Sequence, residues 1–97
     1  MSDLGARTAA YVRAGGFKGQ DAIIALAVAK GESSWNPKAF NGSDPSGGSF
    51  GIFQINGVHK PTENQKWNPV DNSMLAYKVF VDAGNSFHPG PVCASGA

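Results

Sequence analysis

One carboxylic acid stands at the end of the most apolar run in this chain. Glu32 follows the run at residues 22–29 and is the only acid between Asp21 and Asp44. A carboxyl group at the end of an apolar helix face loses hydration, and this loss favours its protonated form near neutral pH. Such a group can act as a general acid that protonates a departing oxygen. Glu32 is therefore the candidate catalytic residue.

Polar and glycine residues that could bind a hydroxyl-rich ligand follow in two segments. Turn-forming pairs at residues 36–48 predict a loop or small hairpin that lines a cleft beside Glu32. Residues 49–57 predict a short strand or tight extended turn, in which Gln54 and Asn56 are polar groups within an apolar run. One protonatable carboxyl facing amide and hydroxyl groups is typical of a site that cleaves glycosidic bonds.

The composition limits the size, partners and cofactors that we expect for this protein. The 97 residues suffice for one small domain over residues 1–97, and only 15% of them are charged. A net charge of +1 gives no electrostatic reason to expect nucleic acid or an anionic membrane as a partner. The single cysteine, Cys93, allows no intrachain disulfide, and no cluster has the spacing of metal ligands. We expect a monomer without metal or cofactor.

Three helices are predicted, at residues 3–14, 19–32 and 69–83. Asp3 is a candidate cap for the first helix, and the glycines at 15–16 end it. The second helix is apolar on nearly all sides, which predicts a central helix. The third has a cap at Asn68 followed by Pro69. Its expected apolar face consists of Met74, Leu75, Tyr77, Val79 and Val81. Residues 58–67 are expected to be a polar connection, and residues 85–97 a poorly ordered tail.

Two segments together resemble the soluble lytic transglycosylase family of the lysozyme superfamily. The first is Ala-Lys-Gly-Glu-Ser-Ser-Trp-Asn-Pro-Lys-Ala-Phe at residues 29–40, and the second is Ser-Phe-Gly-Ile-Phe-Gln-Ile-Asn at residues 49–56. Their order and spacing match the family pattern, in which a Glu-Ser helix end is followed by a Gly-x-x-Gln segment. The similarity spans about residues 21–83. The segment at 68–72 is similar to that of phage lysins and phage-tail proteins carrying this domain.

The resemblance implies a mainly α, α+β lysozyme-like fold, with a central helix ending at Glu32 and a short strand and loop region beside it. It also implies roles for single residues. Glu32 matches the acid that also works as the base, and Ser33 matches the serine that orients it. Gly51 and Gln54 match the segment that lines the cleft and contacts the sugars, and Ser49 sits near a serine of the family. Ser33 and Asn56 are also among the expected substrate-binding residues. Asn72 matches the asparagine of a third motif.

The third motif departs from the family pattern. Ala76 stands where the family has glycine, and Val79 stands where it has a tyrosine that faces the acid. Tyr77 and Phe80 are the aromatic candidates to replace that tyrosine, and Tyr77 is included among the expected substrate-binding residues. The closing family motif is recognisable only in the segment at residues 82–84.

The resemblance implies cleavage of the β-1,4 bond between N-acetylmuramic acid and N-acetylglucosamine in peptidoglycan. A lytic transglycosylase needs only one carboxyl group and leaves 1,6-anhydromuramic ends. A hydrolytic muramidase needs a second carboxylate, for which Asp44 is the candidate because Asp71 suits a helix start and Glu63 a polar connection. A non-catalytic glycan-binding or virion structural domain is the third alternative.

The start of the chain lacks the apolar segment of a secretory signal, and no run reaches the roughly 20 apolar residues of a membrane span. We therefore expect synthesis in the cytoplasm, no membrane insertion, and action on the cell wall. Such a protein would reach the wall by phage-type release or as part of a virion.

Overall fold

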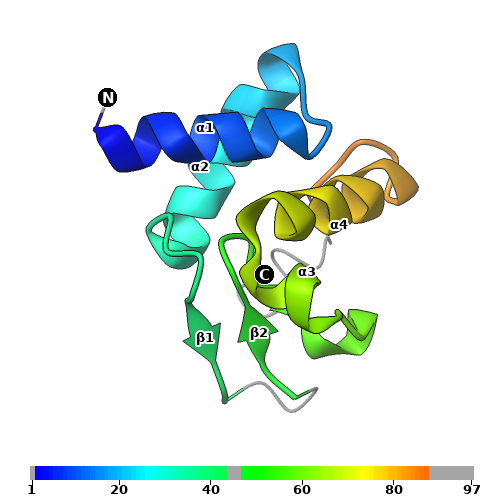
Figure 1. Cartoon of the computed structure of the whole chain (residues 1–97). Helices are drawn as coiled ribbons and strands as arrows, with labels where there is room; N and C mark the ends of the chain where they lie inside the picture. The colour runs from blue at the N-terminus through cyan, green and yellow to red at the C-terminus, as the bar shows by residue number, and fades with distance from the viewer. Residues whose placement is uncertain (1, 44–46, 88–97) are drawn as a thin grey trace.

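The computed structural model describes residues 2–43 and 47–87, and Figure 1 shows their arrangement. Four helices carry most of the described chain, and the two-residue strands β1 and β2 lie together at one end of the helical body, beyond the end of α2. The elements in order are α1 Asp3–Ala14, α2 Gly19–Ser33, β1 Phe40–Asn41, β2 Ser49–Phe50, β3 Ile55–Asn56, the 3₁₀ turn η1 Gly57–His59, α3 Glu63–Trp67 and α4 Pro69–Asp82. The expected mainly α fold is confirmed.

Helix α1 has the predicted bounds but a different cap. The hydroxyl of Ser2 accepts a 3.1 Å hydrogen bond from the Gly5 amide, so Ser2 is the N-cap. Asp3 instead lies in the first turn, where its negative charge favours the helix dipole. The prediction of an Asp3 cap is therefore wrong by one residue.

Helix α2 ends one residue later than predicted, and it is not buried on all sides. Its buried residues are the three alanines Ala22, Ala25 and Ala29. Ile23 is 62% exposed and Ile24 is 44% exposed, so the large apolar side chains lie outside the core. The alanines face the core because their small side chains let neighbouring elements approach the helix closely. Only one face of helix α2 is therefore buried.

Helix α4 begins at the predicted Asn68 cap, but another face is buried. Asn72, Ser73, Ala76 and Phe80 are its buried residues, whereas Met74 and Val81 of the predicted face are 52% and 43% exposed. A Cβ atom added to Gly15 would lie 2.5 Å from the Ser73 Cβ. The close approach of α4 to the end of α1 therefore requires small residues on the buried face, and this requirement overrides the apolar pattern.

The connection at residues 58–67 contains two short elements that the sequence reading missed. The 3₁₀ turn η1 is capped by Asn56, whose side-chain oxygen accepts from the Val58 amide at 2.8 Å. Helix α3 begins with a capping box in which Thr62 and Gln65 exchange side-chain and backbone hydrogen bonds. Two orphan amides are satisfied in this way, which stabilises a helix of only five residues.

The three strands form a small antiparallel sheet in the order β1-β2-β3. Phe50 pairs with Phe40 on one side and with Ile55 on the other, and Ser49 pairs with Asn41 and Asn56. The expected strand and loop region after Glu32 is thus a three-stranded sheet. Both residues of its central strand β2 are buried.

An aromatic cluster fills the core. The ring of Phe17 lies 5.8 Å from that of Phe53, 5.3 Å from Phe80 and 5.6 Å from Phe87, measured between centroids. Phe17 and Phe53 are fully buried. Phe87 falls in the segment predicted to be a poorly ordered tail, and its ring packs in this cluster. The rest of the predicted tail, residues 88–97 with Cys93, lies outside the described residues.

Candidate active site

Glu32 lies in the last turn of α2 and is half-buried. Residues four apart share one side of a helix, so Glu32 follows the half-buried Val28 along the edge of the buried face. Burial removes water from the carboxylate and raises the pKa of Glu32 above its ordinary value of 4.5. A carboxyl in this state keeps its proton to a higher pH and can donate it as a general acid.

A sharp reversal of the chain follows Glu32. Ser34 and Trp35 both have left-handed backbone angles, with φ of 53° and 62°. The Trp35 indole N–H donates a 2.9 Å hydrogen bond back to the Leu26 carbonyl, and the Lys30 ammonium lies 5.0 Å from the indole ring centroid. These contacts hold the chain against α2 immediately after the acid. Two successive non-glycine residues with positive φ would not persist without such support.

Ser33 connects the acid-bearing end of α2 to the sheet region. Its hydroxyl lies 2.7 Å from the Ile52 carbonyl and 3.0 Å from the Ala29 carbonyl, and it has a single proton to share between these acceptors. The bond to Ile52 spans 19 residues of sequence. Ser33 thus places the segment after β2 directly beside the last turn of α2. Its expected contact with sugar stays a prediction.

Gly51 and Gln54 shape the turn between β2 and β3. Gly51 has a φ of 80°, and a side chain there would collide with the Lys66 carbonyl and the Asn72 amide. The amide nitrogen of Gln54 donates to the carbonyls of Ala39 and Gly51, each at 3.0 Å, and Gln54 is only 6% exposed. Both residues therefore have clear structural roles in this turn.

Asn72 is the polar centre of this region and is fully buried in α4. Its side-chain oxygen accepts from the Phe53 amide at 3.0 Å. Its amide nitrogen donates to the carbonyls of Phe50 at 3.0 Å and Gln65 at 2.8 Å. One side chain thus joins α4 to α3 and to the turn that Ser33 contacts. The sequence indicated Asn72 only by its motif position, because its hydrogen-bond partners lie in other elements and are brought to it only by the fold.

The remaining predicted site residues are placed differently. Ser49 and Asn56 are 1% and 5% exposed, and they are paired with each other across the sheet. Tyr77 packs its ring edge-on against Phe17 at 5.0 Å, on the connection that precedes α2. The 13 residues from Gly19 to Glu32 rise about 20 Å along α2. Tyr77 therefore lies beside the other end of α2, and the structure does not bring it together with Glu32.

Asp44, the candidate second carboxylate, lies outside the described residues. Among the described acids, Asp21 lies on the same helix as Glu32, but 11 residues earlier, or about 16 Å along the axis. The Glu63 carboxylate is 2.9 Å from the Lys66 ammonium, and Asp71 lies in the first turn of α4. The described residues contain no group of three or more His, Cys, Asp or Glu placed to hold a metal ion.

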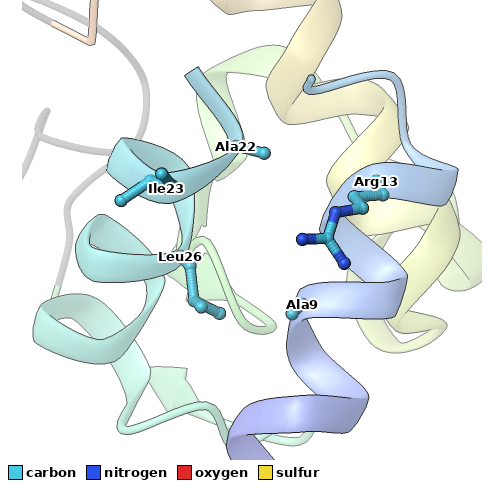
Figure 2. Close-up of a pocket in the computed structure, with 5 residues that line it drawn as sticks. All are labelled: Ala9, Arg13, Ala22, Ile23 and Leu26. Atoms are coloured by element: carbon cyan, nitrogen blue, oxygen red, sulfur yellow. The ribbon is translucent and has the colours of Figure 1, made fainter. Parts of the chain in front are cut away.

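A hollow of about 160 Å³ lies between α1 and α2 (Figure 2). Figure 2 shows Arg13 of α1 directed toward α2, across from Leu26. Ile23 and Leu26 line this hollow from a side of α2 that Glu32 does not share. The hollow is therefore separate from the candidate acid.

No helix in the described part of the chain has the length and hydropathy to cross a bilayer.

Comparison with known families agrees with this fold. Residues 9–89 match the lysozyme-like domain family, from the middle of α1 to beyond Phe87. The match covers most of the chain, so the protein belongs to the lysozyme-like domain family. Lysozyme-like domains are generally found in peptidoglycan-degrading enzymes. No curated protein and no solved structure matches the chain.

Proposed function

We propose that this protein cleaves the β-1,4 bond between N-acetylmuramic acid and N-acetylglucosamine in peptidoglycan, with Glu32 as general acid and then base. The observation that carries the proposal is the half-buried Glu32 carboxyl with its raised pKa at the end of α2. In the first step Glu32 protonates the departing glycosidic oxygen while positive charge develops at the muramic C1. In the second step its carboxylate accepts a proton from the attacking hydroxyl.

The acids among the described residues fit the lytic transglycosylase reaction better than hydrolysis. Retaining and inverting glycosidases need two carboxyl groups about 5–10 Å apart. Asp21 is too distant along α2, and Glu63 is engaged by Lys66. With one carboxyl, the C6 hydroxyl of the muramic residue attacks its own C1, which leaves a 1,6-anhydro end. A muramidase using Asp44 is the alternative that product analysis distinguishes.

The test compares Glu32→Gln with the wild type and with Asp21→Asn, which removes a carboxylate from the same helix. We expect Glu32→Gln to remain folded and to lose clearing of purified cell walls by at least about 10²-fold, the lower end of what a positioned general acid contributes. Asp21→Asn should retain the wild-type rate. A Glu32→Gln variant that clears walls normally would refute the proposed role.

Mass spectrometry of the soluble products identifies the reaction. Anhydromuramic ends support the transglycosylase, whereas reducing ends support the muramidase. Binding to sacculi without soluble products supports a non-catalytic glycan-binding or virion structural domain. That alternative is favoured by the internal bonds of Gln54 and Asn72, because these amides are occupied within the fold. Delivery by phage-type release or within a virion is part of the proposal.

A further inference from the structure

A hollow of about 180 Å³ lies between the sheet and the connection to α3. Its lining residues are Gly47, Phe50, Gly57, Lys60, Pro61 and Lys66. Two of these carry ammonium groups, and the aromatic ring of Phe50 supplies an apolar wall. A water molecule occupies about 30 Å³, so the hollow has room for a small charged group and several methylene groups.

The two lysines are held on this hollow by different contacts. Lys66 has a side chain only 24% exposed, and its ammonium lies 4.5 Å from the Phe50 ring centroid. Lys60 has a left-handed backbone with φ of 51°, and its amide donates to the Gly57 carbonyl at 2.9 Å. The end of η1 thus fixes the backbone of Lys60 on the edge of the hollow that Gly57 also lines.

One acidic residue already pairs with one of these two lysines. Glu63 is the partner of Lys66, at 2.9 Å, and its side chain is 78% exposed. The hydrogen bond and the charge of Lys66 lower the pKa of Glu63, so this partner is ionised at neutral pH. The three groups sum to a single positive charge. This single positive charge favours a ligand with one carboxylate on an aliphatic group over a ligand with several phosphates.

The hollow adjoins the candidate active site along the chain. Ser33, next to Glu32, bonds to the Ile52 carbonyl at 2.7 Å. Phe50 is two residues before Ile52, a span of at most about 7 Å. A ligand attached to a glycan strand at Glu32 therefore has this hollow within short reach.

We propose that this hollow binds a free carboxylate of the peptide stem carried by peptidoglycan. The inference rests on the proposed function, because the stem belongs to the same substrate. Lys60 and Lys66 pair with the carboxylate, and the aliphatic part of the stem contacts the Phe50 ring. A carboxylate is the favoured ligand because Lys66 already binds one, that of Glu63, in this position.

The test is a titration that does not depend on cleavage. The Glu32→Gln protein is titrated at low salt with N-acetylated L-Ala-γ-D-Glu-L-Lys while backbone amide NMR shifts are recorded. We expect shifts at Gly57 and Lys66 with a dissociation constant in the millimolar range. The same peptide with both carboxylates amidated should not produce them. A glycerol phosphate oligomer is titrated in the same way to compare a phosphodiester ligand with the carboxylate peptide.

Variants of single residues complete the test. Lys60→Gln and Lys66→Gln should each weaken peptide binding about two- to fivefold, the range expected for one exposed ion pair. Glu63→Gln should strengthen binding by a similar factor because it frees Lys66. Lys78→Gln removes a solvated lysine from α4 and should leave binding unchanged. The amide spectrum of each variant verifies its fold.

Three outcomes would overturn the inference: equal binding of the amidated peptide, unchanged binding in Lys60→Gln, or tighter binding of the phosphate oligomer. These outcomes are independent of the catalytic proposal. Wall clearing by Glu32→Gln would refute the proposed function without altering the peptide titration.

Discussion

Truncating Asn72 should release the turn beside Glu32 from the helices that hold it. Asn72→Ala deletes three hydrogen bonds of 2.8–3.0 Å, to Phe53, Phe50 and Gln65, and a longer one of 3.4 Å to the Lys66 carbonyl. The mutation leaves the Phe53 amide and the Phe50 carbonyl without these partners in a buried environment. Each bond contributes about 1 kcal/mol, and each buried group left unsatisfied costs about 1–3 kcal/mol.

We therefore expect Asn72→Ala to lower the free energy of unfolding by about 3–5 kcal/mol. A domain of this length has a total stability of about 5–15 kcal/mol, so the loss is a large fraction. The melting temperature should fall by about 15 °C or more, because 1 kcal/mol corresponds to roughly 4–8 °C for a small domain. Asn64→Ala, in exposed α3, is the matched control and should change stability by less than about 0.5 kcal/mol.

The assay is urea unfolding followed by circular dichroism between pH 3 and pH 7, with Asn72→Asp as a second variant. Aspartate keeps the acceptor for the Phe53 amide but turns an oxygen toward the carbonyls of Phe50 and Gln65. Only its protonated form can donate to them, so the stability of Asn72→Asp relative to the wild type should rise as pH falls. A cost below 1 kcal/mol for Asn72→Ala, or an Asn72→Asp penalty independent of pH, would refute the reasoning.

Two further predictions concern stability. Gly51→Ala should cost about 2–5 kcal/mol in urea unfolding, because φ is 80° and the added Cβ meets the Lys66 carbonyl. Gly31→Ala, with open space around its Cβ in α2, should instead stabilise by about 0.5–1 kcal/mol; equal effects at both glycines would contradict this account. Burial raises the pKa of Glu32 above 4.5, so the unfolded chain releases this proton at a lower pH than the folded chain does. The free energy of unfolding of the wild type should therefore fall relative to that of Glu32→Gln as pH rises above about 4.5. If the two free energies changed in parallel with pH, Glu32 would not be desolvated.

Local signals were sufficient for the long helices. The Asn68 cap followed by Pro69 predicted the start of α4, and the glycines at 15–16 predicted the end of α1. These signals involve neighbouring backbone groups, so the sequence carries them in full. The face that each helix buries depends on what packs against it, and there the sequence reading failed. Ser73 is buried in α4 while Met74 is exposed, because α4 meets α1 at a distance that only small residues allow.

The sequence indicated candidate site residues, whose roles stay predictions, but not the hydrogen bonds that join their segments. The motif spacing located Glu32, Gly51 and Gln54, and the structure places the last two in the turn next to Ser33. The bond between Ser33 and Ile52 depends on how the sheet region folds back on α2, which no local signal determines. The hydrogen bond from the Trp35 indole to the Leu26 carbonyl was also not predicted, since it depends on how the chain turns back against α2.

The stacking of Phe87 on Phe17 has a consequence for the order of events during synthesis. Translation delivers Phe17 early and Phe87 late, yet the two rings lie 5.6 Å apart in one cluster with Phe53. A nascent chain that already contains Glu32, the sheet and α4 still lacks one side of its aromatic core. The domain should therefore complete its folding only after residue 87 has left the ribosome.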